Sequence, residues 1–302
     1  MAKSDPELYD WLPLDDRPAI SWPGGARLAF WVAPNVEFYE LQPPPTPARS
    51  AWFRPLPDIL GYGHRDYGNR AGVWRMIEVM DKFEIRGSVS LNVALCDHFP
   101  DIARAIADRG WEFFSHGVYN TRYLYGLDED QERALIRDVR DSVRKWSGQT
   151  LDGWLSPALS NTERTMDLLA EEGVIYTLDL LHDDQPTPIK TRTGRLISVP
   201  YSLEVNDWTA LHVAQATPAE YVETCKLQFD RLYAEGEASG RVMCLPLHPF
   251  LIGMPHRIDA LAEVLDHVTR HEGVWLATGR EIAHWYLEHH HEAALRHART
   301  AR

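Results

Sequence analysis

Short runs of β-branched and aromatic residues recur along the chain, and most are separated by stretches whose apolar residues repeat at helical spacing. Eight runs predict strands, at residues 27–33, 88–93, 111–115, 153–156, 174–179, 196–201, 242–247 and 274–277. Strands that alternate with helices are typical of a parallel sheet, and seven or eight such units favour a barrel over a doubly wound layer. The pattern therefore predicts an α/β barrel of parallel strands.

Two of the helices have clear start signals in the sequence. Asp128 and Gln131 resemble a capping box ahead of a helix over 128–146. Thr217, Pro218 and Glu220 open another helix, with proline at its first position and a T-x-x-E box. A third helix is expected over 257–271, where it ends before a glycine.

The connections indicate one domain over residues 1–302, because no Ser/Gly-rich linker divides the alternating elements. We expect an N-terminal arm at about 1–26, a long Pro-rich loop at 42–69, and a helical tail at about 280–302. Loops this long in compact domains are often lids or contact loops, so 42–69 should cover the pocket mouth or a subunit contact. Its aromatic residues Trp52, Phe53 and Tyr62 would anchor it inward or pack the loop on itself.

Charge and cysteine usage narrow the class of protein. The 302 residues carry 44 acidic against 31 basic side chains, a formal net charge of −13 that repels nucleic acid and anionic membranes. No apolar run reaches the roughly 18 residues of a membrane span and the N-terminus lacks a signal-peptide core, so a cytoplasmic location is expected. The three cysteines form no C-x-x-C pair and should be small buried hydrophobes.

Polar residues follow the predicted strands at their carboxyl ends, where parallel barrels build their sites. Glu37 follows the first strand, His116 the third and His248 the seventh, and we predict that these three line one pocket. Further candidates are Asp183 and Asp184 after the fifth strand, Glu204, Asn206 and Asp207 after the sixth, and Arg122, Tyr123 and Trp208 as pocket walls or packing residues. Glu204, Asn206 and Asp207 have capping and positioning of loops as an alternative role.

Other chemistries lack their motifs. The chain has no G-x-S-x-G elbow, no G-x-x-x-x-G-K-[ST] loop, no H-E-x-x-H and no G-x-G-x-x-G opening a helix. The glycines of G-Y-G-H-R-D-Y-G at 61–68 do not match a phosphate loop and are interpreted as turns in the long loop.

Seven segments in order along the chain resemble the polysaccharide-deacetylase (NodB-like) superfamily. They are N-V-E-F at 35–38, Y-G-N-R-A-G-V-W-R at 67–75, S-H-G at 115–117, S-P-A-L-S-N-T at 156–162, D-D-Q-P at 183–186, V-P-Y-S-L-E-V-N-D at 199–207 and L-H-P-F-L-I-G-M-P-H-R at 247–257. Within the superfamily the chain is similar to the branch of bacterial metal-independent allantoinase and cyclic imidases. The resemblance implies a distorted (β/α) barrel, a homo-oligomer and a small-molecule substrate, with Pro157 among the substrate-binding residues.

The resemblance also implies that the metal site is degraded. Metal-dependent relatives carry a T-F-D-D-type motif and an H-[ST]-x-x-H motif. Here Glu37 falls on the position of the base, Phe38 on the metal-binding carboxylate, His116 on the first histidine and Asn120 on the second. A phenyl ring offers no lone pair and an Asn carbonyl is a poor ligand for zinc-like ions, so no cofactor is expected. A shift in alignment could instead bring Glu40 into the site.

These implications give a hydrolase that opens carbon–nitrogen bonds in small amides, cyclic imides or ureides without a metal. Glu37 or His248 would take a proton from water, His116 or His248 would return one to the nitrogen, and Asn120 with backbone N–H groups would hold the oxyanion. Two alternatives remain open: a metal-dependent deacetylase of N-acetylated sugars or oligosaccharides, and a non-catalytic binding barrel.

Overall fold

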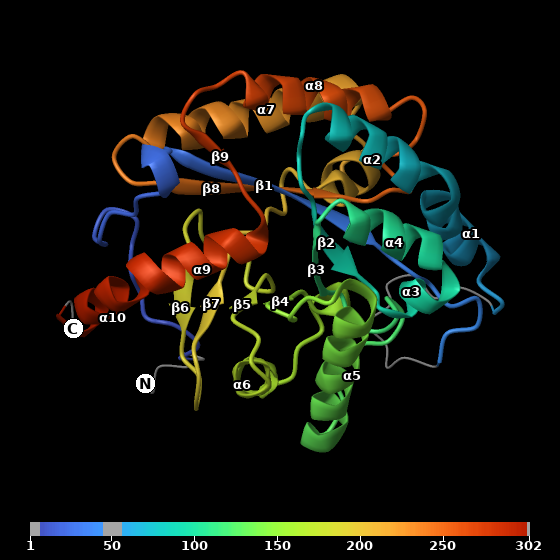
Figure 1. Cartoon of the computed structure of the whole chain (residues 1–302), viewed down its shortest axis with the longest axis horizontal. Coiled ribbons are helices and arrows are strands. Elements are labelled where there is room, and N and C mark those ends of the chain that lie inside the picture. Colours follow the sequence, from blue (N-terminus) through green and yellow to red (C-terminus); the bar gives the residue numbers. More distant parts are fainter. Residues whose placement is uncertain (1–6, 45–55, 301–302) are drawn as a thin grey trace.

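A computed structural model describes residues 7–44 and 56–300 and shows one curled sheet covered by helices (Figure 1). The strands are β1 (Leu28–Val36), β2 (Ser88–Leu91), β3 (Glu112–Ser115), β4 (Gly153–Trp154), β5 (Tyr176–Thr177), β6 (Thr187–Ile189), β7 (Leu196–Ser198), β8 (Arg241–Leu247) and β9 (Val274–Leu276). The α-helices are α1 (Ile59–Tyr67), α2 (Val73–Lys82), α3 (Ala94–His98), α4 (Pro100–Asp108), α5 (Glu129–Ser147), α6 (Thr165–Glu171), α7 (Pro218–Glu235), α8 (Ile258–Thr269), α9 (Gly279–His289) and α10 (His291–Thr300). Short 3₁₀ or π turns are η1 (Pro23–Gly25), η2 (Gly68–Gly72), η3 (Pro157–Leu159) and η4 (Trp208–Val213).

The sheet runs in the order β6-β7-β5-β4-β3-β2-β1-β8, and β9 also pairs with β1. Every pairing is parallel except that of β6 with β7. The two edges meet where the backbone N–H of Val242 in β8 donates to the carbonyl of Asp184 at 2.9 Å. The expected distorted α/β barrel is confirmed.

All eight predicted strands are present, and the structure adds β6. This strand lies in the connection 181–194, where no strand is predicted. It forms an antiparallel pair with β7, with Thr187 opposite Ser198. A three-residue strand that contains proline gives too short a pattern to be recognised from periodicity.

The central strand β1 is buried along its whole length because both faces of the sheet are covered. Phe30 and Val32 pack toward the helical layer that includes α2 and α8, while Ala29 and Trp31 pack into the barrel interior. This continuous apolar run is what a parallel sheet covered on both sides requires. The cysteines Cys96, Cys225 and Cys244 are all free and buried, as predicted.

The predicted helix starts are confirmed in detail. Asp128 and Gln131 form a reciprocal capping box at the start of α5. Thr217 and Glu220 form another at the start of α7, with Pro218 at its first position. Among the helices of the described residues, none is long and apolar enough to cross a bilayer.

The long connection 42–69 is not a loop throughout, and the interpretation of its glycines as turns is wrong. Asp58 caps α1, and α1 continues through the π-helical turn η2 into α2. Tyr62 packs its ring 6.4 Å from that of Phe38, so this anchor does point inward. The other two predicted anchors, Trp52 and Phe53, lie outside the described residues.

Candidate active site

Glu37, His116 and His248 come together at the carboxyl ends of β1, β3 and β8. The Oε1 atom of Glu37 lies 3.7 Å from Nε2 of His116 and 3.5 Å from Nε2 of His248. All three side chains are buried. A carboxylate oxygen thus faces two imidazole nitrogens. The two imidazoles follow β3 and β8, which are more than 100 residues apart in the sequence.

His248 is held by a buried aspartate. Its Nδ1 donates to Oδ1 of Asp207 at 2.6 Å, and its backbone N–H donates to Oδ2 of the same carboxylate at 2.8 Å. Burial lowers the pKa of His248, but Asp207 and Glu37 together outweigh it and raise this pKa to about 9. His248 is therefore an imidazolium at neutral pH, with Nε2–H directed toward Glu37.

Asp207, predicted as a polar candidate after the sixth strand with loop positioning as its alternative role, is a positioning residue for His248. It is fully buried and directly precedes η4. Its Oδ2 also accepts the backbone N–H of Ile252 at 3.3 Å, so it orders the turn that follows β8. The sequence signal for Asp207 is its position at the end of V-N-D, after the sixth predicted strand.

His116 is fixed through its other ring nitrogen. Nδ1 donates to the carbonyl of Leu155 at 3.2 Å, which turns Nε2 toward Glu37. Asn92 bridges the two sides of the site, because its Oδ1 accepts the backbone N–H of Phe38 at 2.9 Å and its Nδ2 donates to the carbonyl of His116. The backbone on both sides of the carboxylate is thereby locked.

Arg65, on α1, is a site residue that no sequence pattern indicated. Its Nε lies 3.9 Å from Oε2 of Glu37. The guanidinium lies over three rings, those of Tyr39 at 4.0 Å, Phe250 at 4.6 Å and Trp208 at 5.3 Å. Rings on several sides hold this cation in place.

The charge of Glu37 is strongly stabilised. Burial alone would raise its pKa, but hydrogen bonds from His116 and His248 and the charges of His248 and Arg65 hold this pKa well below its usual range. These contacts favour the carboxylate form of Glu37.

Three buried polar atoms at this site have no hydrogen-bond partner among the described residues. They are Oε2 of Glu37, Nε of Arg65 and Oδ1 of Asn120. Buried polar groups are nearly always paired, so unpaired ones need an explanation. One donor beside two acceptors suits a ligand that carries both a carbonyl and an N–H.

Three predicted pocket residues lie around this group. Asn120 donates its backbone N–H to the carbonyl of Phe38 at 3.0 Å and its Nδ2 to the hydroxyl of Tyr39 at 3.1 Å. Trp208 has its ring 6.1 Å from that of His248. Burial, Tyr125 and the charge of Glu37 raise the pKa of the Tyr123 hydroxyl, because this ring lies close to the site.

Other predicted contacts support the site or lie at its rim. Pro157 packs under the loop after His116, where a Cβ added to Gly117 would come within 2.7 Å of its ring. Oδ1 of Asn206 accepts the backbone N–H of Trp208 at 2.9 Å, so it has the alternative capping role.

Arg122 is half exposed and pairs with Glu40 at 2.7 Å. Glu204 is exposed in the turn before η4.

The expectation that Asp183 and Asp184 share the pocket is wrong. Asp183 pairs with Arg17 of the N-terminal arm at 2.8 Å. The carbonyl of Asp184 contacts the second residue of β8, whereas His248 follows its last residue. Six extended residues separate these points by roughly 20 Å. β6 runs antiparallel, so the segment before it meets the amino end of β8.

Comparison with known proteins gives a consistent result. A model of the polysaccharide deacetylase family matches residues 65–177. A candidate polysaccharide deacetylase of Schizosaccharomyces pombe is 26% identical over 93% of this chain and 96% of that protein. The crystal structure of PuuE allantoinase superposes with a TM-score of 0.79 at 27% identity, covering 90% of this chain and 94% of that one. A probable polysaccharide deacetylase from Pseudomonas aeruginosa PAO1 gives a TM-score of 0.79 at 26% identity, covering 90% of this chain and 95% of that one.

These findings support a place in the NodB-like polysaccharide deacetylase superfamily for this chain. Its similarity to deacetylases and to an allantoinase supports a hydrolase that acts on carbon–nitrogen bonds.

At the positions that match the metal ligands of this superfamily, the described residues offer an incomplete donor set. Phe38 stacks on His98 at 4.2 Å between ring centroids and offers no ligand atom. Glu40 is used by Arg122 and by Thr121, whose hydroxyl donates to it at 2.7 Å. The cation beside Glu37 is Arg65, which would repel a divalent ion. These residues do not fit a catalytic metal.

Proposed function

We propose that the chain hydrolyses carbon–nitrogen bonds in small amides, with cyclic imides or ureides as the substrate class, by metal-independent general acid–base catalysis. The observation that carries this proposal is the arrangement around Glu37. Its carboxylate lies near two imidazole Nε2 atoms, and the guanidinium of Arg65 lies beside its second oxygen.

In the first step a water molecule attacks the substrate carbonyl carbon. The new C–O bond forms as Glu37 accepts the proton of this water. Glu37 is a weak base when Arg65 and both histidines stabilise its charge, so a substrate that draws Arg65 onto its own carbonyl would raise the basicity of Glu37. His116 then orients the carboxylate from the opposite side.

In the second step the tetrahedral intermediate collapses and the C–N bond breaks. The imidazolium of His248 donates its Nε2 proton to the departing nitrogen, which leaves His248 neutral and Glu37 protonated. Because these two side chains lie 3.5 Å apart, the proton can pass from Glu37 to His248 and restore both groups. Atoms and charges then balance over one turnover.

The oxyanion would be stabilised by Arg65. Its Nε–H is buried and has no hydrogen-bond partner among the described residues, whereas one N–H of the Asn120 amide already donates to Tyr39. An ordered donor in a site shielded from water typically contributes 10² to 10³-fold. Asn120 instead offers Oδ1 as an acceptor for a substrate N–H.

This pair of contacts favours an imide or ureide over an acetylated sugar. In a cyclic imide or a cyclic ureide the ring holds the carbonyl oxygen and the N–H on the same side, which fits a donor at Arg65 and an acceptor at Asn120. The trans amide of an N-acetylated sugar directs these two groups in opposite directions. The nitrogen of an imide also carries a second acyl group, so it leaves more readily without metal assistance. The structural similarity to PuuE allantoinase supports the same class.

The test is a turnover screen of cyclic imides, hydantoins, allantoin and N-acetylated sugars, with and without a strong chelator. We expect turnover of an imide or ureide that survives the chelator. Glu37→Gln should lower kcat by about 10²-fold or more with little change in Tm, whereas Glu40→Gln, the neighbouring carboxylate, should stay within a factor of a few.

Two outcomes would overturn the proposal. Activity that is lost in chelator and restored by one added metal would establish the metal-dependent deacetylase. No turnover of any amide, imide or ureide would favour the binding barrel.

A further inference from the structure

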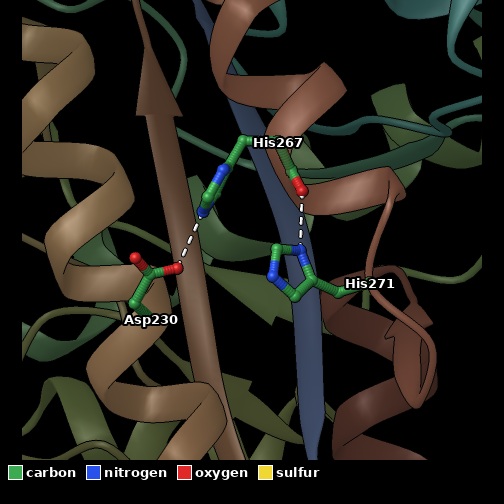
Figure 2. A group of neighbouring side chains, drawn as sticks. All are labelled: Asp230, His267 and His271. Carbon is green, nitrogen blue, oxygen red and sulfur yellow. Dashed lines mark hydrogen bonds and ion pairs between the residues drawn. The ribbon is translucent and has the colours of Figure 1, made fainter.

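A cluster of one carboxylate and two imidazoles lies on the outer helical layer, away from the active site. Asp230 is on α7, His267 is on the last turn of α8, and His271 follows the end of that helix (Figure 2). One potential ligand atom from each residue lies within 4.8 Å of the others. The reaction proposed above uses none of the three.

The cluster is ordered by hydrogen bonds that leave ligand atoms turned inward. Nε2 of His267 contacts Oδ1 of Asp230 at 2.7 Å, and Nδ1 of His271 donates to the carbonyl of His267 at 2.8 Å. Figure 2 shows the second ring nitrogen of His271 on the side of Asp230. Metal-binding histidines typically donate their other ring N–H to a carbonyl or carboxylate in this way, which fixes the tautomer.

Aromatic rings fix the orientation of both imidazoles. The ring of Phe229 lies 5.4 Å from that of His267 and 4.9 Å from that of His271. Tyr233 lies 5.3 Å from His271 and donates its hydroxyl to the carbonyl of Glu272 at 2.7 Å. The three candidate ligands therefore sit on an apolar wall that limits their motion.

We propose that Asp230, His267 and His271 bind a divalent transition-metal ion such as Zn²⁺, with solvent completing the coordination. Imidazole and carboxylate are ligands that zinc prefers, at bond lengths of about 2.0–2.2 Å. Ligand atoms around a tetrahedral ion are then roughly 3.3 Å apart, so the widest pair would close by about 1.5 Å. The hydrogen bond between His267 and Asp230 would be replaced by the two metal bonds.

The position of the cluster assigns the ion a stabilising role. α7 ends at Glu235, six residues before β8 begins (Figure 1). His271 lies three residues before β9. The cluster is thus at the amino ends of these strands, whereas Glu37 and His248 are at the carboxyl ends. In barrel proteins the amino-terminal face is associated with stability and the carboxyl-terminal face with catalysis. An ion here would tie α7 to the turn between α8 and β9.

The experiment is a calorimetric titration of the metal-stripped full chain with Zn²⁺, together with Tm measurements. We expect one equivalent of Zn²⁺ to bind and, at saturation, to raise Tm by about 3 °C. Asp230→Asn and His271→Gln should bind Zn²⁺ at least tenfold more weakly and lose the shift in Tm. His289→Gln removes a surface histidine on α9 and should match the parent chain.

The metal-free Tm of each variant checks that it folds, and Asp230→Asn preserves the size of the side chain. Absence of Zn²⁺ binding, or equal binding by all four proteins, would overturn the proposal. Because the active site is separate, kcat should be the same with Zn²⁺ and with chelator. A change in kcat would contradict the metal-free mechanism and leave the binding result unaffected.

Discussion

Two aspartate–histidine pairs in this chain have nearly the same geometry and different surroundings. Asp207 and His248 approach to 2.6 Å, and Asp230 and His267 approach to 2.7 Å. The side chains of the first pair are 0% and 9% exposed, against 53% and 25% in the second. The contact distance does not separate a buried pair from a surface pair.

Burial and additional partners make the difference. Asp207 accepts two backbone N–H groups besides the imidazole, and His248 also faces Glu37. Removing one partner of a buried ion pair typically lowers the free energy of unfolding by about 3–5 kcal/mol. An exposed ion pair contributes about 0–1 kcal/mol to it. The buried pair fixes one ring orientation and one protonation state, which catalysis needs.

The sharpest test of this comparison is to make the same change in both pairs. Asp207→Asn should lower kcat by about 10³ to 10⁴-fold, because an amide cannot stabilise the His248 imidazolium or hold its tautomer. Asp230→Asn should leave kcat within a factor of two. Steady-state kinetics on the best substrate of the screen measures both. Equal effects of the two changes would show that burial of the pair is not what matters.

A second matched pair tests the cation at the site. Arg65→Gln should lower kcat/KM by about 10² to 10³-fold, since an oxyanion donor is lost. Arg70→Gln, five residues further along, removes a guanidinium whose side chain is 72% exposed and whose partner is Asp66. That variant should keep full activity. If Arg65→Gln retained kcat and changed only KM, Arg65 would bind the substrate without stabilising the transition state.

The smallest expected effect is the pH dependence of the buried pair. kcat/KM should be level near neutrality and fall about tenfold per pH unit above about 9, because His248 must carry a proton to act as an acid. Its pKa is raised above the usual 6.5, so its contribution to stability is complete below about 6.5 and is lost as the pH rises through about 9. A pH–rate profile measures the effect, and Asp207→Asn should shift its alkaline limb to lower pH. An alkaline limb unchanged by Asp207→Asn would assign it to another group.

The sequence predicted the elements that depend on local periodicity. The strands are long apolar runs or are flanked by turn signals, and the two capping boxes are short-range patterns, so both were found. Glu37, His116 and His248 were identified because the residue after a parallel strand has a known place in the barrel. Asp183 and Asp184 were misplaced because that rule fails where the next strand is antiparallel.

The missed residues depend on contacts distant in sequence. Arg65 lies in a glycine-containing segment whose composition suggests turns, and its helix is stabilised by packing of Tyr62 and by the cap at Asp58. Asp207 was visible as a polar residue after a strand, but its partner is 41 residues away. The local sequence pattern does not indicate which distant residue a side chain will contact.

The glycines of η2 show where this chain can and cannot be altered in the laboratory. The backbone of Gly68 and Gly72 lies directly against the turn that carries His248. A Cβ added to Gly68 would lie 2.7 Å from the backbone nitrogen of Phe250, and one added to Gly72 would overlap the carbonyl of Pro249. Libraries intended to change substrate preference should therefore leave these glycines unaltered and vary Tyr123 and Asn120 instead, where new side chains would reshape the pocket without moving His248, the proposed general acid.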